Sequence, residues 1–298
     1  MLVAVTGAGG QLGAAVVAEL VARLGPGSVR ALTRNPARVA VPGLDVRRAD
    51  FDDPEGLLGA FDGVDRLLLV STDRIGHRAV QHRAAVAAAA RAGVGHVFYT
   101  SAVNADDPAN PAPVAPDHRA TEEALAASGL PWTALRNGIY TETLLLAVRP
   151  AVAAGVYASN GGDGAISYVT RNDLAAATAA ILAEDPLAGS SIGTAAADPG
   201  RVLELTGPEA VTGADIAAVL TGLTGREIRF QPLPDEVIEA GMSRAGLPAQ
   251  AIAMAVRFGR AAREGYLGPV TDTVRRCLGR QPTSVAQFLA RHREALAG

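Results

Sequence analysis

Lysine is absent from the sequence, and all 27 basic residues of the 298-residue chain are arginine. A lysine side chain is central to the Walker A phosphate loop, to enzymes that form a Schiff base and to those that use pyridoxal phosphate. These three kinds of chemistry are therefore excluded, and any reaction of the protein has to use other side chains.

Cysteine and unbalanced charge are scarce too. Cys277 is the single cysteine, so an internal disulfide is impossible, and we interpret it as a packed thiol because its neighbours do not supply the His and Asn of a thiol nucleophile. The net charge is −3, from 27 basic and 30 acidic residues. This balance does not indicate binding to nucleic acid or to an anionic membrane, so a small-molecule ligand is expected.

Long apolar runs are also missing. No run reaches the roughly 18 residues of a membrane span, and the chain opens on a short apolar segment with no cationic leader. We therefore expect a cytoplasmic protein. Hydrophobic residues still make up 49% of the chain, which is enough for a globular protein with a sizeable core.

The first half of the sequence contains a regular alternation of strand and helix patterns. Apolar strand patterns occupy residues 1–6, 29–33, 44–49, 66–70, 96–100 and 132–136. Helical patterns lie between them at 11–24, 76–92 and 117–127. Such alternation is typical of parallel strands joined by right-handed crossovers. It predicts an α/β fold with a doubly wound parallel sheet, the Rossmann architecture.

The second half is less regular. The glycine-rich stretch 155–164 indicates a loop with a short strand on either side, and Asn172 or Asp173 suits the N-cap of a helix. Further patterns predict a strand at 202–205, a helix at 211–221, a strand at 227–231 and two helices within 235–263, interrupted at 246–248.

These patterns also predict how the chain is divided. Residues 1–136, joined by about 165–206, are expected to form the dinucleotide-binding Rossmann domain. Residues 137–164 and 207–298 would form a smaller, mainly helical lobe. The substrate is expected in the cleft between the two parts.

Glycines crowd the turn after the first strand, in the segment Thr6-Gly7-Ala8-Gly9-Gly10-Gln11-Leu12-Gly13. Gly7 and Gly10 allow a tight turn close to a pyrophosphate, whose charge the helix N-terminus binds, and Gly13 allows close packing of helix on strand. Glycines in this pattern also fit a purely structural turn, but their place between strand and helix favours dinucleotide binding. The candidate cofactor-binding residues here are Gly7, Gly9, Gly10, Gln11, Leu12 and Gly13.

The end of the second strand indicates which dinucleotide is bound. The residues there are Thr33-Arg34-Asn35-Pro36, with no carboxylate for a free ribose 2′-hydroxyl. An arginine at this place can form a forked contact with a 2′-phosphate, so Arg34 favours NADPH over NADH. The alternative is a solvated arginine in a surface turn.

Several segments together resemble the NmrA-like, atypical short-chain dehydrogenase/reductase family, and within it most closely the bacterial type 2 NADPH:quinone reductases and the triphenylmethane reductases. The resemblance covers nearly the whole chain. The segments that carry it are Thr6 to Gly13, Arg34-Asn35-Pro36, Ala49 to Glu55, Gln81-His82, Ala92 to Ser101, Asp117 to Glu122, Leu135 to Tyr140 and Val169 to Asp173. The Tyr-x-x-x-Lys pair of typical short-chain dehydrogenases is missing.

The resemblance implies further contacts with the cofactor. Asp50 and Phe51 would flank the adenine, and Val70, Ser71 and Thr72 would line the ribose side. Thr100 and Ser101 would lie beside the nicotinamide, while Asn137 to Tyr140, including Ile139, would close the pocket. All of these residues lie at the carboxyl ends of predicted strands, which is where an open parallel sheet binds its ligand.

Two candidate catalytic residues also depend on the resemblance. In related plant reductases a catalytic lysine occupies the position of His118, and a histidine there could orient a substrate carbonyl or transfer a proton. Tyr140 is a second candidate for a hydrogen bond to the substrate oxygen. For both residues a purely structural role is the alternative, as a ring that caps a helix or packs at a strand end.

A metal site is not expected. His77 and His82 are five residues apart and lack the neighbouring carboxylate of a metalloprotease motif. The acidic group at 50–55 is better explained by adenine contact and by charge at a helix N-terminus.

The expected function is direct hydride transfer from NADPH, without a flavin, to a quinone or a similar conjugated electrophile. Reduction of a triphenylmethane or azo dye is an alternative with the same chemistry. A second alternative is a regulator that senses the dinucleotide without turnover, as some NmrA-like proteins do. We expect a monomer or homodimer with a small-molecule acceptor. Glu123 and Thr143 depart from the reductase pattern and leave the identity of the substrate open.

Overall fold

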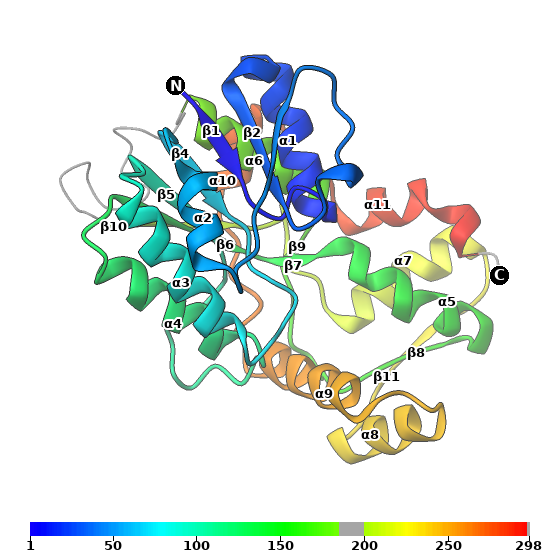
Figure 1. The fold of residues 1–298 in the computed structure, drawn as a ribbon. Coiled ribbons are helices and arrows are strands. Elements are labelled where there is room, and N and C mark those ends of the chain that lie inside the picture. Colours follow the sequence, from blue (N-terminus) through cyan, green and yellow to red (C-terminus); the bar gives the residue numbers. More distant parts are fainter. Residues whose placement is uncertain (185–199, 297–298) are drawn as a thin grey trace.

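A seven-stranded parallel sheet forms the centre of the molecule (Figure 1). The computed structural model describes residues 1–184 and 200–296 of the chain. In their order across the sheet, the strands are β10 (Gly200–Leu205), β6 (Trp132–Asn137), β5 (His96–Ala102), β4 (Arg66–Leu69), β1 (Val3–Val5), β2 (Val29–Thr33) and β3 (Asp45–Arg48). The predicted doubly wound sheet is confirmed. The strand order reverses between β1 and β4, a switch point of the kind at which such sheets bind ligands.

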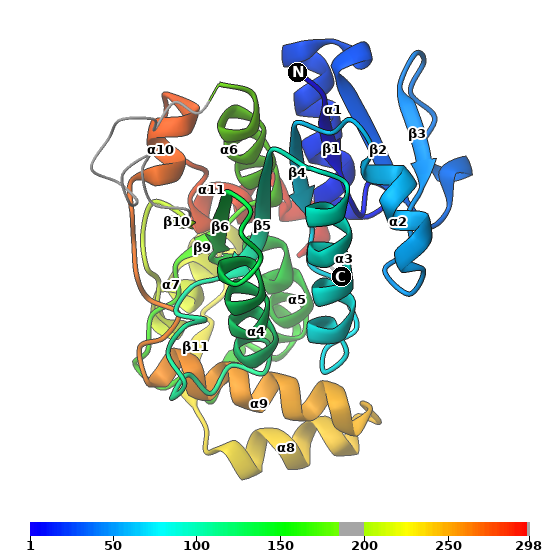
Figure 2. The ribbon, with the colours of Figure 1, turned by 60° about the vertical axis from the view of Figure 1, so that its left-hand side comes forward.

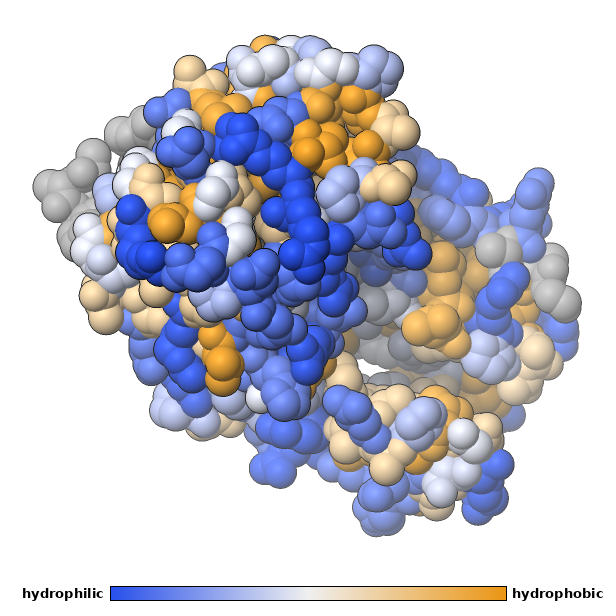
Figure 3. All heavy atoms as spheres, in the orientation of Figure 1, coloured by the Kyte–Doolittle hydropathy of each residue, from blue (hydrophilic) through white to orange (hydrophobic). Residues whose placement is uncertain are grey.

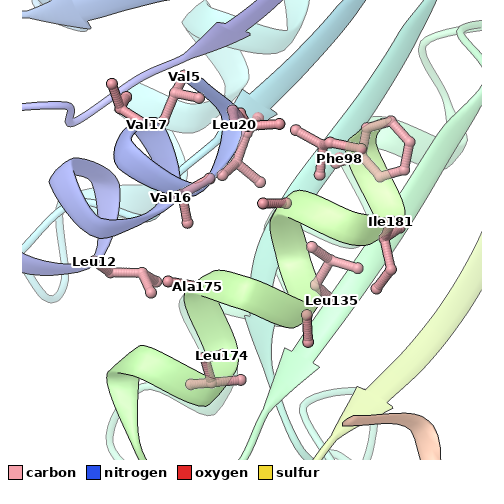
Figure 4. Packing of buried hydrophobic residues seen from close by; sticks show 14 of the residues in the cluster. Val5, Leu12, Val16, Val17, Leu20, Phe98, Leu135, Leu174, Ala175 and Ile181 are labelled. Atoms are coloured by element: carbon pink, nitrogen blue, oxygen red, sulfur yellow. The ribbon is translucent and has the colours of Figure 1, made fainter. Parts of the chain in front are cut away.

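Helices cover both faces of this sheet (Figure 2). One face carries α1 (Gln11–Leu24), α6 (Arg171–Ala183) and α10 (Thr273–Leu278), and the other carries α2 (Pro54–Phe61), α3 (Arg78–Arg91) and α4 (Ala115–Ala126). Figure 4 shows the first of these contacts, with Val16 and Leu20 of α1 packed near Leu174 and Ile181 of α6.

The alternation of side chains along β1 explains how one short strand serves both layers. Val3 and Val5 point into the cluster under α1 and α6, whereas Ala4 belongs to the cluster under α2 and α3. All three residues are 0% exposed. A strand buried on both faces is continuously apolar, which is the pattern that the sequence has here.

A smaller part of the molecule is built from the second half of the chain. Its elements are β7 (Ile139–Tyr140), β8 (Val156–Ser159), β9 (Tyr168–Val169), β11 (Arg229–Pro232), α5 (Leu144–Ala154), α7 (Gly213–Thr224), α8 (Asp235–Arg244), α9 (Ala249–Arg263) and α11 (Val285–Arg291). Strand β8 pairs with β11, and β7 pairs with β9. The predicted pair of helices interrupted at 246–248 is confirmed as α8 and α9, which form a hairpin at the edge of the molecule (Figures 1 and 2). Short 3₁₀ turns lie at Pro26–Ser28, Pro36–Arg38, Thr141–Thr143 and Arg293–Ala295.

Three details of the sequence prediction were wrong. The N-cap of α6 is Thr170, not Asn172 or Asp173, because the Thr170 hydroxyl accepts a hydrogen bond of 3.1 Å from the Asp173 amide. The glycine-rich stretch 155–164 contains strand β8 and is not only a loop. Helices α5, α10 and α11 were missed, and α5 carries Pro150 inside, which obscures its pattern.

The last hundred residues contact both parts of the molecule. Val274 of α10 packs in the cluster of α1 and α6, whereas Phe288 of α11 packs in the cluster of α5 and α7. The predicted boundaries of the two parts therefore stay a prediction. Hydrophilic side chains gather beside a hollow in the surface between the part that holds the sheet and the α8–α9 hairpin (Figure 3). Within residues 1–184 and 200–296, every helix is too short or too polar to cross a membrane.

Candidate active site

A cavity of about 810 Å³ lies at the carboxyl ends of the central strands and brings together most of the predicted site residues. The predicted residues that line it are Gly7, Gly9, Gly10, Gln11, Leu12, Gly13, Arg34, Asp50, Phe51, Val70, Ser71, Thr72 and Tyr140. The others, Thr100, Ser101, His118, Asn137 and Ile139, do not line it.

The glycine loop forms the floor of the cavity at the N-terminus of α1. Gly7 has a φ of +63°, which other residues rarely adopt. A Cβ atom on Gly13 would lie 2.2 Å from the Gly7 carbonyl oxygen, so only glycine allows α1 to approach the loop this closely. Gly10 is the N-cap and no side chain caps this end of the helix. The backbone amides of the first turn therefore face the cavity as donors for an anion.

Arginines line the cavity beyond β2. Arg34 and Arg38 are both exposed there, and neither takes part in an ion pair with any residue of 1–184 or 200–296. Two unpaired guanidinium groups suit a phosphate. Asp50 and Phe51, which follow β3, line the same end.

The opposite end of the cavity lies beyond β4 and contains Ser71, Thr72, Arg78, Tyr140 and Arg171. The Arg78 Nε atom donates to the Thr72 carbonyl oxygen. The Arg171 guanidinium lies 5.1 Å from the centre of the Tyr140 ring. Burial raises the pKa of Tyr140 above its ordinary value of 10.0, although the Asn137 amide and the charges of Arg171 and Arg78 act in the opposite direction. The phenol is therefore protonated at neutral pH.

Three of the predicted residues outside the lining are buried. The Thr100 hydroxyl accepts a 2.8 Å hydrogen bond from the Ser71 amide. The Ser101 hydroxyl donates to Glu122 at 2.6 Å. Asn137 is 6% exposed, and its Oδ1 atom has no hydrogen-bond partner among the described residues. Of the three, Thr100 holds a residue of the cavity wall, Ser71, in place.

His118 is also outside the lining, and only 4% of it is exposed. Its Nδ1 atom lies 2.7 Å from the Tyr99 hydroxyl, and its Nε2 atom lies 3.4 Å from Arg78 Nη1. Burial, followed by the charge of Arg78, lowers the pKa of His118 well below 6.5. The ring is therefore neutral at pH 7, and it lies behind the residues that line the cavity.

Ten residues of the cavity lining are not among the predicted site residues, and four of them are arginines: Arg38, Arg74, Arg78 and Arg171. Arg78 is the first residue of α3, and no local pattern distinguishes it from the other arginines of that helix. Arg171 did belong to a segment that carried the family resemblance. The one signal that applies to all four is the preference of a phosphate-rich ligand for arginine, and it does not select among 27 candidates.

The residues of the cavity fit a dinucleotide phosphate. The uncapped N-terminus of α1 fits a pyrophosphate, and the close packing of Gly13 against the Gly7 carbonyl lets the helix begin directly at the loop. Arg34 and Arg38 fit a third phosphate group. The part of the chain that the structure describes contains no group of three or more potential metal ligands.

Comparisons with known proteins agree with this geometry. A model of the family described as NAD(P)H-binding matches residues 7–185. Quinone oxidoreductase 2 of Escherichia coli is 36% identical over 97% of this chain and 98% of its own length. Its crystal structure with NADPH has a TM-score of 0.89 at 35% identity and covers 98% of this chain and 99% of that chain.

A second structure extends the comparison. The triphenylmethane reductase of Citrobacter sp., in complex with NADP(H), has a TM-score of 0.87 at 29% identity and covers 98% of this chain and 99% of that one. The predicted resemblance to NmrA-like reductases, the Rossmann fold and the NAD(P)H cofactor are thus confirmed. The chain belongs to the NAD(P)H-binding family.

Proposed function

We propose that the protein is an NADPH-dependent oxidoreductase that reduces a quinone or a similar conjugated acceptor. The observation that carries this proposal is one cavity whose two ends differ in chemistry. The uncapped N-terminus of α1 and the unpaired Arg34 and Arg38 occupy one end, and Tyr140 lies at the other. NADPH, when bound, supplies a hydride to the acceptor.

The residues that would hold the cofactor follow from their place along the cavity. The amides at Gly9 to Leu12 would bind the pyrophosphate, and Arg34, supported by Arg38, would bind the 2′-phosphate. Asp50 and Phe51 would flank the adenine, and Val70, Ser71 and Thr72 would line the ribose. Thr100, Ser101, Asn137 and Ile139 would act as positioning residues behind this wall.

Tyr140 is the proposed proton donor. A quinone that has accepted a hydride still needs one proton on oxygen. Burial raises the pKa of Tyr140, so the phenol keeps a hydrogen that it can donate to the acceptor. The residue lines the cavity and is protonated at neutral pH, as a hydrogen-bond donor must be.

His118 is proposed as a positioning residue. It contacts Arg78 and Tyr99 but lies outside the cavity lining, so its effect on substrate has to pass through Arg78. A role for His118 as an imidazolium acid does not fit its lowered pKa.

The test is the rate of NADPH and NADH oxidation by the purified protein, side by side, with and without 1,4-benzoquinone. We expect acceptor-dependent oxidation that is much faster with NADPH. Tight NADPH binding without turnover of any quinone or dye would overturn the proposal and favour the dinucleotide-sensing regulator.

From the proposed function we also expect a particular partner, cellular location and oligomeric state. The partner would be a small-molecule acceptor bound between the sheet and the lobe formed by residues 137–164 and 207–298. The protein would act in the cytoplasm, where NADPH is regenerated, as a monomer or homodimer. Sedimentation of the purified protein distinguishes the two states.

A further inference from the structure

Arg78 places a positive charge at the end of the cavity beyond β4, which we call the acceptor end. Its neighbours do not neutralise this charge with an ion pair. It is half-buried and lines the cavity. Its hydrogen-bonding partners are the Thr72 carbonyl oxygen and the neutral ring of His118. Within residues 1–184 and 200–296, the ion pairs of the protein do not include Arg78.

The other arginines at this end differ in that respect. Arg74 forms an ion pair with Asp52 at 2.9 Å, and Arg171 lies 3.8 Å from Glu142. Their charges are therefore largely balanced by carboxylates. Arg78 is therefore the arginine at this end whose charge is available to a ligand.

Arg78 lines the same cavity as the proposed proton donor, Tyr140. The groups whose charges act on its guanidinium are Tyr99, Asp117, Tyr140 and Asp73. In the other direction, the charge of Arg78 acts on the Tyr140 phenol. Arg78 begins α3 and Tyr140 ends β7, so two separate elements bring a cation and a hydroxyl donor to the same end of the cavity.

We propose that Arg78 determines the class of acceptor, favouring one whose oxygen becomes negatively charged on reduction and disfavouring a cationic one. This inference depends on the proposed function. It predicts that the site prefers quinone-like acceptors to triphenylmethane dyes, which are cations.

The two acceptors differ in how charge changes. A quinone that gains a hydride, two electrons and one proton, from the C4–H bond of NADPH becomes a hydroquinone monoanion with its charge on oxygen. A proton from Tyr140, replaced from solvent, completes the hydroquinone. A triphenylmethane cation that gains the same hydride at its central carbon becomes neutral and needs no proton. A fixed cation stabilises the negative charge that develops on the quinone oxygen. The same cation repels a triphenylmethane cation before it reacts.

The test compares the two acceptors in one variant. Arg78→Gln should lower kcat/KM for 1,4-benzoquinone by about 10²-fold, as the loss of one donor to a developing oxyanion does. The same variant should raise kcat/KM for crystal violet several-fold, because a repelling charge is gone. Arg78→Lys, which keeps the charge but not the fork, should recover part of the quinone rate.

Arg38→Gln is the matched control, since it removes a cavity arginine at the other end. It should lower the rates with both acceptors by the same factor through weaker NADPH binding. Equal losses with both acceptors in Arg78→Gln would overturn the inference while leaving the proposed function intact.

A binding measurement keeps the inference testable without turnover. The probe is 4-nitrophenol, whose phenolate is coloured, titrated with the protein in the presence of NADP⁺. We expect the wild-type protein to lower the pKa of the bound phenol and Arg78→Gln to restore the value in water. An unchanged pKa in the wild type would overturn the anion site. If the wild type shows this shift but reduces no acceptor, the proposed function fails and the anion site stands.

Discussion

The phenol of Tyr99 lies 2.7 Å from Nδ1 of His118, entirely inside the protein. Arg78 has only donors, so His118 Nε2 accepts from it and His118 Nδ1 donates to the Tyr99 oxygen. The Tyr99 hydroxyl in turn lies 3.3 Å from His82 Nδ1. The Thr121 hydroxyl also contacts His82 Nδ1 at 2.9 Å.

The other nitrogen of His82 completes this chain. His82 Nε2 accepts from the Thr72 amide at 3.2 Å. The hydrogen bonds therefore run through α3, β5 and α4 and return to the loop at the acceptor end of the cavity. Both imidazoles have to be neutral for every one of these bonds to form.

We expect the stability of the protein to decrease on acidification because of these two histidines. Burial, followed by the charge of Arg78, lowers the pKa of His82 from 6.5 to about 3, and the pKa of His118 is lowered in the same direction. The unfolded chain therefore binds more protons below pH 6.5, and the free energy of unfolding falls as the pH drops from 6.5 toward 3. Each histidine contributes up to about 1.4 kcal/mol per pH unit.

Urea unfolding at pH 7.5, 6 and 5 measures this dependence. His82→Gln should be less stable at pH 7.5 but should have a shallower slope against pH. A slope that is the same in the wild type and the variant would contradict the prediction.

A second prediction concerns the buried ion pair between Glu122 of α4 and Arg136 of β6. Both side chains are 9% exposed, and their closest atoms are 2.6 Å apart. Glu122→Gln should lower the free energy of unfolding by about 1.5–3 kcal/mol, because it removes the buried carboxylate from the Arg136 guanidinium and leaves it only the exposed Asp106, at 2.8 Å. Chemical denaturation gives the value. Glu55→Gln removes an exposed ion pair with Arg91 and should cause no measurable change.

The glycine loop offers a third test. Gly13→Ala places a Cβ atom against the Gly7 carbonyl oxygen, so the helix has to move away from the loop. We expect a loss of about 1–3 kcal/mol in stability together with much weaker NADPH binding. Thermal unfolding and fluorescence titration with NADPH measure the two effects. Gly59→Ala, in an open position of α2, should instead be neutral or stabilise the protein by up to about 1 kcal/mol.

Cofactor preference provides a fourth prediction. Arg34→Gln removes a charge-assisted contact with the 2′-phosphate, which is worth about 1.5–3 kcal/mol. The affinity for NADPH should therefore fall by about 10- to 100-fold, while the affinity for NADH should not change. Arg244→Gln, an exposed arginine of α8, serves as the control and should leave both affinities as they are. Equal losses for NADPH and NADH would show that Arg34 acts only on the shape of the loop.

The fifth prediction tests Tyr140. Tyr140→Phe should lower kcat with 1,4-benzoquinone by about 10²-fold or more, because the proton donor is lost, and should leave NADPH binding close to that of the wild type. The pKa of Tyr140 is raised above 10.0, so the wild-type rate should show no decline from its ionisation up to that pH. Stopped-flow kinetics measures both. Tyr157→Phe removes a buried hydroxyl outside the cavity and is the comparison; an equal loss there would argue against a specific role.

Much of the fold and of the cofactor end of the site was predictable because the signals are local. The helix at Gln11–Leu24 and the strand at Val29–Thr33 have the bounds that the patterns indicated. A turn that needs a glycine with φ of +63° and a strand buried on both faces each require particular residue types at a few consecutive positions. Arg34 follows its strand directly, so its place at the edge of the sheet followed from the strand itself.

The acceptor end was not predictable in the same way. Arg78 and Tyr140 are far apart in the sequence, and they meet only because α3 and β7 are positioned by different neighbours. His118 looked like a candidate for substrate contact, yet the packing of α4 on β5 buries its ring against Tyr99.

The sequence by itself determined the alternating fold and the glycine loop, and it predicted a phosphorylated dinucleotide, since each depends on periodicity, backbone freedom or one side chain within a short segment. The tertiary structure decided which side chains share the cavity and which of their charges stay unpaired. Those properties depend on long-range packing and on desolvation, and the residues of a single helix or strand do not predict either of them.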